Sequence, residues 1–350
     1  MNLPNILARL LRCAVLSAAI GALPVSSIHA QSKTVVFAGW GGSIQKAQRQ
    51  VFFDSFEKET GIKVIDVPDV QLPKLKAMVE TGNMQWDVVQ ALGMWIPQGA
   101  KDNLWEKLDF NVISKQGVPP ALVDDYSLGN STYGMVLAYN TKSAKGNVPS
   151  SWGNFWDLKG HPGPRGMFDG PRYTLEAALL ADGVTPEKLY PLDVDRAFRS
   201  LDKIKNHVAV WWKQWPQVPV LLASQELAMS LTSNTRINAV KKAEGAPVDL
   251  SWSQSLMTVD FLAVPRRAKN RENAMKLIQW MNDPKRQAEL AKITGIGPGN
   301  AEALKYLTDA EKADLASYHY QKGEMVLFNN GWWAENEQAM SQRWDQWKLQ

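Results

Sequence analysis

The chain has almost no cysteine. Cys13 is the only one among 350 residues, and it lies in an N-terminal segment that we expect to be absent from the mature protein. This excludes disulfides, a thiol nucleophile and a thiolate metal site. A chain without disulfides depends on its hydrophobic core, and roughly 320 residues are enough to build one in two domains.

Long apolar runs are also missing. Arg9 and Arg12 precede an apolar stretch over 13–23, which is too short to span a bilayer, and small residues follow up to Ala30. This order is typical of a secretory signal peptide over 1–30. We therefore expect export to the periplasm.

Neither positive nor negative charge is in large excess. Without Arg9 and Arg12 the formal net charge falls from +4 to +2. A nearly neutral composition favours neither nucleic acid nor a membrane surface as partner. We expect a soluble, globular monomer that needs no cofactor.

Catalytic motifs are incomplete. The stretch GGSIQ at 41–45 lacks the second glycine of Gly-x-Ser-x-Gly, and no Gly-Lys-Ser/Thr triplet marks a phosphate-binding loop. After the proposed signal peptide the histidines, His161, His207 and His319, are isolated in sequence. These absences argue against an enzyme and against a metal site.

Strand-like and helix-like segments alternate after residue 33. Apolar, β-branched stretches at 34–37, 62–67 and 87–90 predict strands, and apolar residues at helical spacing between them predict two helices. A βαβαβ order is typical of one half of a doubly wound α/β sheet. In such sheets ligands bind at the carboxyl ends of the strands.

The middle of the chain changes character. Further strands are predicted at 134–142, 226–232 and 256–265, and a tract rich in Pro, Gly and Trp occupies 148–172. We interpret this tract as the passage into a second lobe. The strand at 256–265 would return the chain to the first lobe.

Several of these stretches together resemble the periplasmic substrate-binding proteins of ABC importers, most closely the spermidine/putrescine-binding-like branch. The similar motifs, in order, are GWGGSIQ, FEKETGIKVI, WDVV, LAYNTK, SWGNFWD, DFLAVPRRAKNRENAMKLIQWMNDP and TGIGPGN. The resemblance implies an α/β protein of the two-lobed periplasmic-binding-protein fold (type II), each lobe a sheet flanked by helices and the two joined by crossing strands. The first lobe would comprise 31–139 plus 260–305, and the second 140–259 plus 306–350.

The resemblance also implies a role. The lobes would close on a small amine-containing solute (a polyamine, a diamine or an ω-amino acid) and deliver it to the membrane subunits of an ABC permease, without enzymatic activity. Three alternatives stay open. They are a sugar or opine-type ligand stacked on tryptophans, a ferric ion, for which 92–96 lacks the usual adjacent tyrosines, and a periplasmic hydrolase.

Two residues carry the expected amine site. Trp40 follows the first strand, as does the aromatic that contacts ligand in polyamine binders, and an indole face attracts an ammonium by ~0.5–2 kcal/mol. Asp260 lies in an otherwise apolar strand, where burying it unpaired would be costly, and it aligns with the family's amine-binding aspartate. The structural alternatives are a Trp packed against the core and an Asp that holds backbone amides of the hinge.

Other positions depart from the polyamine pattern. Gly41, Gly42 and Ser43 would form a helix N-terminus that favours a carboxylate, or Ser43 would simply cap the helix. Tyr173 replaces a ligand-binding Glu of the family, and Arg172 could clamp a carboxylate or pair with Asp169. These departures favour an ω-amino acid, with a diamine as rival. Further candidates for the wall of the site are Met94, Asn234, Trp252 and Trp332.

Overall fold

The computed structural model describes residues 33–350, which form one unit by their backbone contacts. The predicted signal peptide and Cys13 lie outside the described residues.

One sheet runs through the described residues, in the order β2-β1-β3-β9-β5-β8-β6-β7. The short strand β10 pairs with β5, while β4 and β11 pair with β9. The strands are β1 Thr34–Ala38, β2 Lys63–Val67, β3 Val88–Leu92, β4 Trp105–Glu106, β5 Ser127–Asn140, β6 Arg165–Phe168, β7 Val208–Trp212, β8 Met229–Ser233, β9 Val248–Pro265, β10 Gly297–Pro298 and β11 Met325–Leu327.

The first part of this sheet has the predicted βαβαβ order. Strand β1 is parallel to both β2 and β3. The first connection holds α1 Gly42–Gln48, a π-helical stretch Arg49–Phe53 and α2 Asp54–Thr60, and the second holds α3 Leu72–Thr81. Both end at a left-handed glycine, Gly61 (φ 69°) and Gly82 (φ 71°), because glycine adopts this conformation without steric cost.

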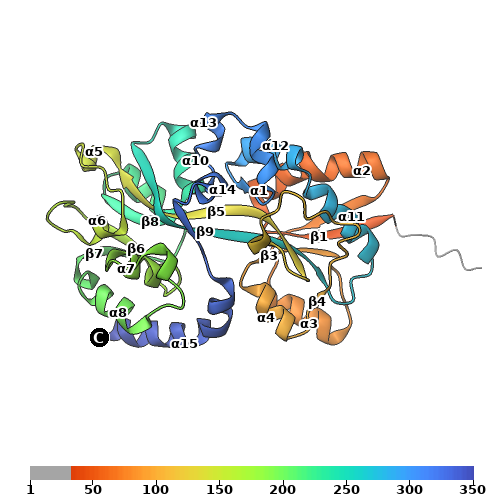
Figure 1. The fold of residues 1–350 in the computed structure, drawn as a ribbon, viewed down its shortest axis with the longest axis horizontal. Helices are drawn as coiled ribbons and strands as arrows, with labels where there is room; N and C mark the ends of the chain where they lie inside the picture. The colour runs from red at the N-terminus through yellow and green to blue at the C-terminus, as the bar shows by residue number, and fades with distance from the viewer. Residues whose placement is uncertain (1–32) are drawn as a thin grey trace, which may run out of the picture. The chain divides into compact units, whose positions relative to one another are not determined.

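Two long antiparallel strands, β5 and β9, carry the chain between the two halves of the sheet (Figure 1). Their register shifts between Met135 and Leu137, where β9 jumps from Leu256 to Ser251. Strand β9 begins at Val248, earlier than the predicted 256. Its first half is partly exposed and polar and therefore lacks the apolar signal on which the prediction relied.

The described residues contain two large hydrophobic clusters, which we use to define the lobes. The first lobe surrounds a cluster that includes Leu128 and Met257, and the second surrounds one that includes Met135, Leu256 and Phe328. This is the two-lobed α/β architecture that the resemblance implies. The lobe limits 31–139 plus 260–305 and 140–259 plus 306–350 stay a prediction.

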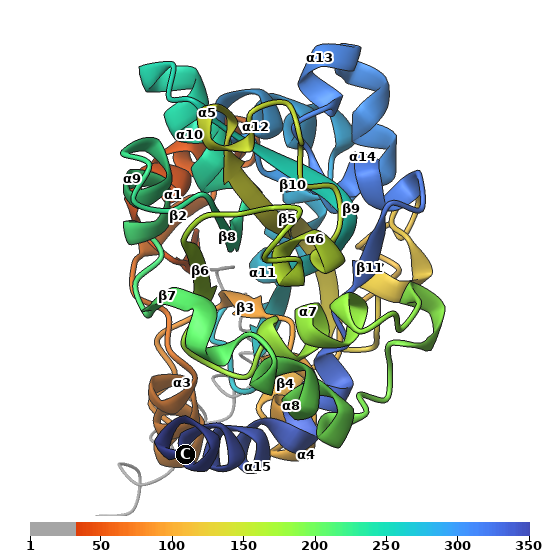
Figure 2. The same ribbon diagram turned by 90° about the vertical axis from the view of Figure 1, so that its left-hand side faces the viewer.

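Helices flank the sheet in both lobes (Figures 1 and 2). The last of them, α15 Asn330–Leu349, packs Trp333, Trp344 and Trp347 into the second cluster. Its Glu335 lies 3.1 Å from Lys101, which ends α4 Trp95–Lys101 in the first lobe. The remaining α-helices are α5 Thr141–Ala144, α6 Trp152–Trp156, α7 Thr174–Ala181, α8 Val194–Asp202, α9 Gln217–Ala223, α10 Asn234–Glu244, α11 Arg271–Met281, α12 Pro284–Thr294, α13 Asp309–Lys312 and α14 Ala316–Gln321.

Candidate functional site

A cavity of about 590 Å³ is lined by residues of both lobes. Of the eleven site residues predicted from sequence, the structure brings six to its wall: Trp40, Ser43, Met94, Arg172, Tyr173 and Asp260. The wall also includes residues that the sequence reasoning missed, among them Tyr133, Trp215, Arg236 and Phe328.

Asp260 is the buried acid of this cavity. Its side chain is 5% exposed, and its Oδ2 accepts hydrogen bonds from Trp40 Nε1 (2.8 Å), Tyr133 Oη (2.9 Å) and Gln90 Nε2 (3.1 Å). Among the described residues, Oδ1 has no hydrogen-bond partner. Three donors hold one oxygen in place, so the other is available to a ligand.

The carboxyl group of Asp260 lacks a cationic partner. Burial raises its pKa to about 6, and the hydrogen bonds from Tyr133, Trp40 and Gln90 offset only part of that rise. Desolvation disfavours the charged form of an acid, whereas a nearby positive charge favours it. An ammonium group beside Oδ1 would therefore lower this pKa and stabilise the carboxylate.

The loop after β1 positions Trp40 by its backbone. Gly41 has φ 78° and a Cβ there would lie 2.9 Å from Pro68 Cβ, while Gly42 has φ 68°. The Gly41 N–H donates to Gln45 Oε1 at 2.7 Å, so a partner within the protein already satisfies it. The prediction that Ser43 caps α1 is wrong, because Gly41 is the N-cap. The two glycines lie outside the wall of the cavity, and their left-handed conformation explains their presence.

Arg172 forms part of the wall but already has a charged partner. Its Nε lies 3.3 Å from Glu337 Oε1 on α15, and its Nη1 lies 3.3 Å from Met94 Sδ of the first lobe. The alternative pairing with Asp169 does not form, because that carboxylate lies near Lys213 and Lys348. Arg172 therefore brings little net charge to the cavity.

Arg236 is the second guanidinium of the wall, and it has no partner. Within 33–350 its side chain makes no ion pair or hydrogen bond, and burial lowers its pKa. It lies in the first turn of α10, whose Ser233 and Thr235 also line the cavity. A cation at a helix N-terminus opposes the helix dipole. This unfavourable placement was the signal in the sequence that could have pointed to Arg236.

Aromatic side chains of the second lobe form an apolar part of the wall. The Tyr173 ring lies 5.0 Å from Phe328 and 6.3 Å from Trp215, measured between ring centroids. Tyr173 adopts φ 66°, which is rare for a bulky residue and costs about 1–3 kcal/mol. Strain of this kind is common at binding sites. Here it occurs at a residue of the cavity wall.

Three predicted wall residues are placed elsewhere. Asn234 accepts a hydrogen bond from the Gly134 N–H (2.8 Å) and donates to the Asp314 carbonyl (3.0 Å), so it joins backbone segments. Trp252 stacks on His319 with centroids 4.2 Å apart. Trp332 packs edge-on against Trp333.

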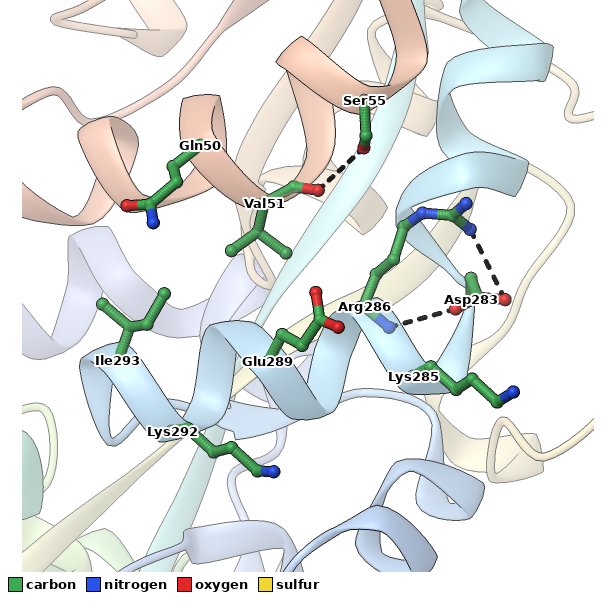
Figure 3. Close-up of a pocket in the computed structure, with 9 residues that line it drawn as sticks. All are labelled: Gln50, Val51, Ser55, Asp283, Lys285, Arg286, Glu289, Lys292 and Ile293. Atoms are coloured by element: carbon green, nitrogen blue, oxygen red, sulfur yellow. Dashed lines mark hydrogen bonds and ion pairs between the residues drawn. The ribbon is translucent and has the colours of Figure 1, made fainter. Parts of the chain in front are cut away.

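A second hollow, of about 630 Å³, lies between the segment around Val51 and helix α12 (Figure 3). Its charged side chains are either exposed, as Lys285 and Glu289 are, or engaged, as Arg286 is with Asp283 (3.5 Å) and the Trp280 ring (3.5 Å to the centroid). It holds no buried charge without a partner. The cavity around Asp260 is therefore the better candidate.

Residues 33–350 lack two further features. No cluster of three or more His, Cys, Asp or Glu side chains in this range could hold a metal ion. No helix in this range combines the length and the apolar character needed to cross a membrane.

Comparison with known proteins agrees with the geometry. The sequence profile of a family described as bacterial extracellular solute-binding protein matches residues 52–318. The gamma-aminobutyric acid-binding protein of Pseudomonas aeruginosa is 32% identical over 333 residues, covering 92% of this chain and 93% of that protein. The spermidine/putrescine-binding periplasmic protein 1 of Haemophilus influenzae is 28% identical, covering 80% of this chain and 79% of its own length.

A solved structure extends the comparison to the fold. The Atu4243-GABA receptor superposes with a TM-score of 0.82 at 38% identity, covering 90% of this chain and 97% of that receptor. Together with the profile, it confirms the two-lobed α/β fold and the resemblance to substrate-binding proteins of ABC importers. The chain belongs to the bacterial extracellular solute-binding protein family.

Proposed function

We propose that this protein binds a small solute with one ammonium and one carboxylate group, an ω-amino acid such as gamma-aminobutyric acid. The ammonium would lie at Asp260 Oδ1 against the Trp40 ring, and the carboxylate at Arg236 near the start of α10. The alkyl chain would pack on the aromatic side chains around Tyr173.

One observation carries the proposal. Asp260 and Arg236 line the same cavity, have opposite charges, and have no charged partner within 33–350. Asp260 is buried and Arg236 is partly buried, and charges withdrawn from water are unfavourable unless they are paired. A ligand with two opposite charges pairs both residues at once, whereas a ligand with one charge leaves the other residue unpaired.

The charges of the cavity wall also favour this ligand over the rival diamine. The second ammonium of a diamine would meet Arg236, whereas the described wall has one carboxylate, Asp260. Like charges at close range in a partly desolvated site repel by several kcal/mol at an effective dielectric of about 20. A diamine should therefore bind more weakly than an ω-amino acid. The relative named for gamma-aminobutyric acid is also the more similar of the two curated relatives compared.

Family membership supports the wider role. We propose that the protein acts as a monomer in the periplasm, closes its lobes on the solute, and presents the closed form to the permease of an ABC importer. We also propose that it does not convert the solute.

A thermal-shift screen of refolded, ligand-stripped protein tests the proposal. The panel should contain ω-amino acids, diamines, polyamines, α-amino acids, sugars and Fe(III). A ligand at a hundredfold excess over its Kd stabilises the protein by ~2.7 kcal/mol, which gives a clear shift. We expect ω-amino acids to give the largest shift.

Matched variants test whether the thermal shift depends on Asp260 and Arg236. D260N and R236Q should each abolish most of that shift, while R199Q, at an exposed position on α8, should preserve it. A larger shift with a sugar that survives D260N would instead favour a sugar-type ligand. Turnover of an ester or amide by the purified protein would overturn the proposal that it is not an enzyme.

A further inference from the structure

The two guanidinium groups of the cavity differ in one respect, the presence of a partner. Arg236 has none within 33–350, whereas Arg172 is paired with Glu337, a residue of α15 outside the described wall. The two arginines therefore contribute differently to the net charge that a ligand meets.

The environment of Glu337 suits it to compensate the charge of Arg172. Its side chain is 32% exposed, its Oε2 is buried without a hydrogen-bond partner, and burial raises its pKa while Arg172 lowers it. A half-buried carboxylate is tolerated when a cation compensates it. The ion pair thus favours the charged form of Glu337 and offsets the charge of Arg172.

The pair also lies where the two lobes meet. Arg172 follows β6 in the second lobe, and its Nη1 contacts Met94 Sδ, just after β3 in the first. Arg172 and Met94 are both part of the cavity wall. A change of charge here would act on a ligand enclosed by both lobes.

We infer that Glu337 determines which charge type of ligand the cavity accepts, by neutralising Arg172 and leaving Asp260 and Arg236 as its unpaired charges. Glu337 is a positioning residue that acts through Arg172. This inference rests on the proposed function and adds two kinds of discrimination to it. Because Glu337 compensates Arg172, a second carboxylate gains no free cation, and because Arg172 compensates Glu337, a diamine gains no free carboxylate.

Opposite single substitutions should shift that preference in opposite directions. E337Q frees the charge of Arg172, so the affinity for L-glutamate relative to gamma-aminobutyric acid should rise about tenfold. R172Q leaves Glu337 uncompensated, so the affinity for putrescine relative to gamma-aminobutyric acid should rise about tenfold. The double variant R172Q/E337Q restores neutrality and should return both ratios to those of the wild type.

Calorimetric titration of the three ligands against each variant measures these ratios. E335Q is the matched control, because Glu335 lies on the same helix, is exposed, and pairs with Lys101 away from the cavity. It should leave both ratios unchanged. A purely structural role for the Arg172–Glu337 pair would weaken all three ligands alike, and unchanged ratios in both single variants would overturn the inference.

The two proposals fail in different ways. If the wild type prefers putrescine to gamma-aminobutyric acid, the proposed function is wrong, yet R172Q should still raise the preference for putrescine. If the wild type prefers gamma-aminobutyric acid but the ratios do not respond to the charge of Glu337, the present inference alone is wrong.

Discussion

Trp40 Nε1 donates a hydrogen bond to Asp260 Oδ2 at 2.8 Å and so joins the loop after β1 to the long strand β9. The same indole ring lies 5.5 Å from Trp95, measured between centroids. Trp40 therefore both orients the acid and contributes an aromatic face to the cavity. Its two roles can be separated by substitution.

W40F keeps an aromatic ring and removes the N–H donor. Hydrogen bonds to charged groups contribute about 1.5–3 kcal/mol, so the affinity for the amine ligand should fall about tenfold or more. Calorimetry at neutral pH measures the change. An unchanged Kd would show that Trp40 does not orient Asp260 for the ligand.

Binding should weaken in acid. Because the pKa of Asp260 is raised to about 6 in the ligand-free protein, protons compete with the ammonium group below that pH. The Kd should be constant from about pH 7 to 8 and rise toward tenfold per pH unit below about 6. Titrations across this range test the prediction.

The D260N variant is the control for this pH dependence. It should bind the amine ligand at least about thirtyfold more weakly than the wild type near pH 7, since a buried charge-assisted hydrogen bond is lost. Its Kd should also show no step near pH 6. A step of equal size in D260N would assign the titration to another group.

Glu176 on α7 should make the stability of the folded protein depend on pH. Its Oε1 accepts hydrogen bonds from Trp333 Nε1 (2.6 Å) and Tyr190 Oη (2.7 Å), Oε2 is buried without a partner, and burial raises its pKa from 4.5 to about 7. A raised pKa means that the folded state holds this proton more tightly than the unfolded state. The resulting stabilisation is complete below about pH 4.5 and is lost as pH rises through about 7.

E176Q tests the assignment by urea denaturation at several pH values. The free energy of unfolding of the wild type, relative to E176Q, should fall by about 3 kcal/mol between pH 4.5 and 8. Trp333 and Tyr190 keep an acceptor in the variant, so the comparison isolates the ionisation. A constant difference would show that Glu176 does not titrate in this range.

G41A tests the role of the glycines after Trp40. A Cβ at Gly41 would meet Pro68 Cβ at 2.9 Å with φ at 78°, so the variant should lose about 1–2 kcal/mol of stability, or roughly 1–3 °C in Tm. Gly42 also has positive φ but no atom within 4 Å of its Cβ position, so G42A should lose less. Equal Tm values for both variants would contradict this explanation.

The parts of the fold that were predicted from sequence are those set by local pattern. The βαβαβ order after residue 33 follows from short apolar strands and helices that end at Gly61 and Gly82. Asp260 stood out because one charge interrupts an apolar strand, and the structure places it in the cavity wall. Such signals need no knowledge of distant contacts.

The remaining parts depend on contacts between distant segments. Trp252 resembled a ligand-stacking residue, yet it stacks on His319, and Asn234 holds the backbone of Gly134. A cation in the first turn of a helix marks Arg236 as unusual, but a strand followed by a helix does not say in the sequence which cavity that turn faces. The pairing of β5 with both β8 and β9 brings Asp260 on β9 and the start of α10, which follows β8, to the same cavity.

The most direct test of the central claim is a calorimetric comparison of four ligands of similar length: gamma-aminobutyric acid, butyrate, butylamine and putrescine. If Asp260 and Arg236 each pair with one end of the ligand, gamma-aminobutyric acid should bind at least about a hundredfold more tightly than each of the other three. Putrescine binding as tightly as gamma-aminobutyric acid, or butylamine binding as tightly as either, would contradict the claim.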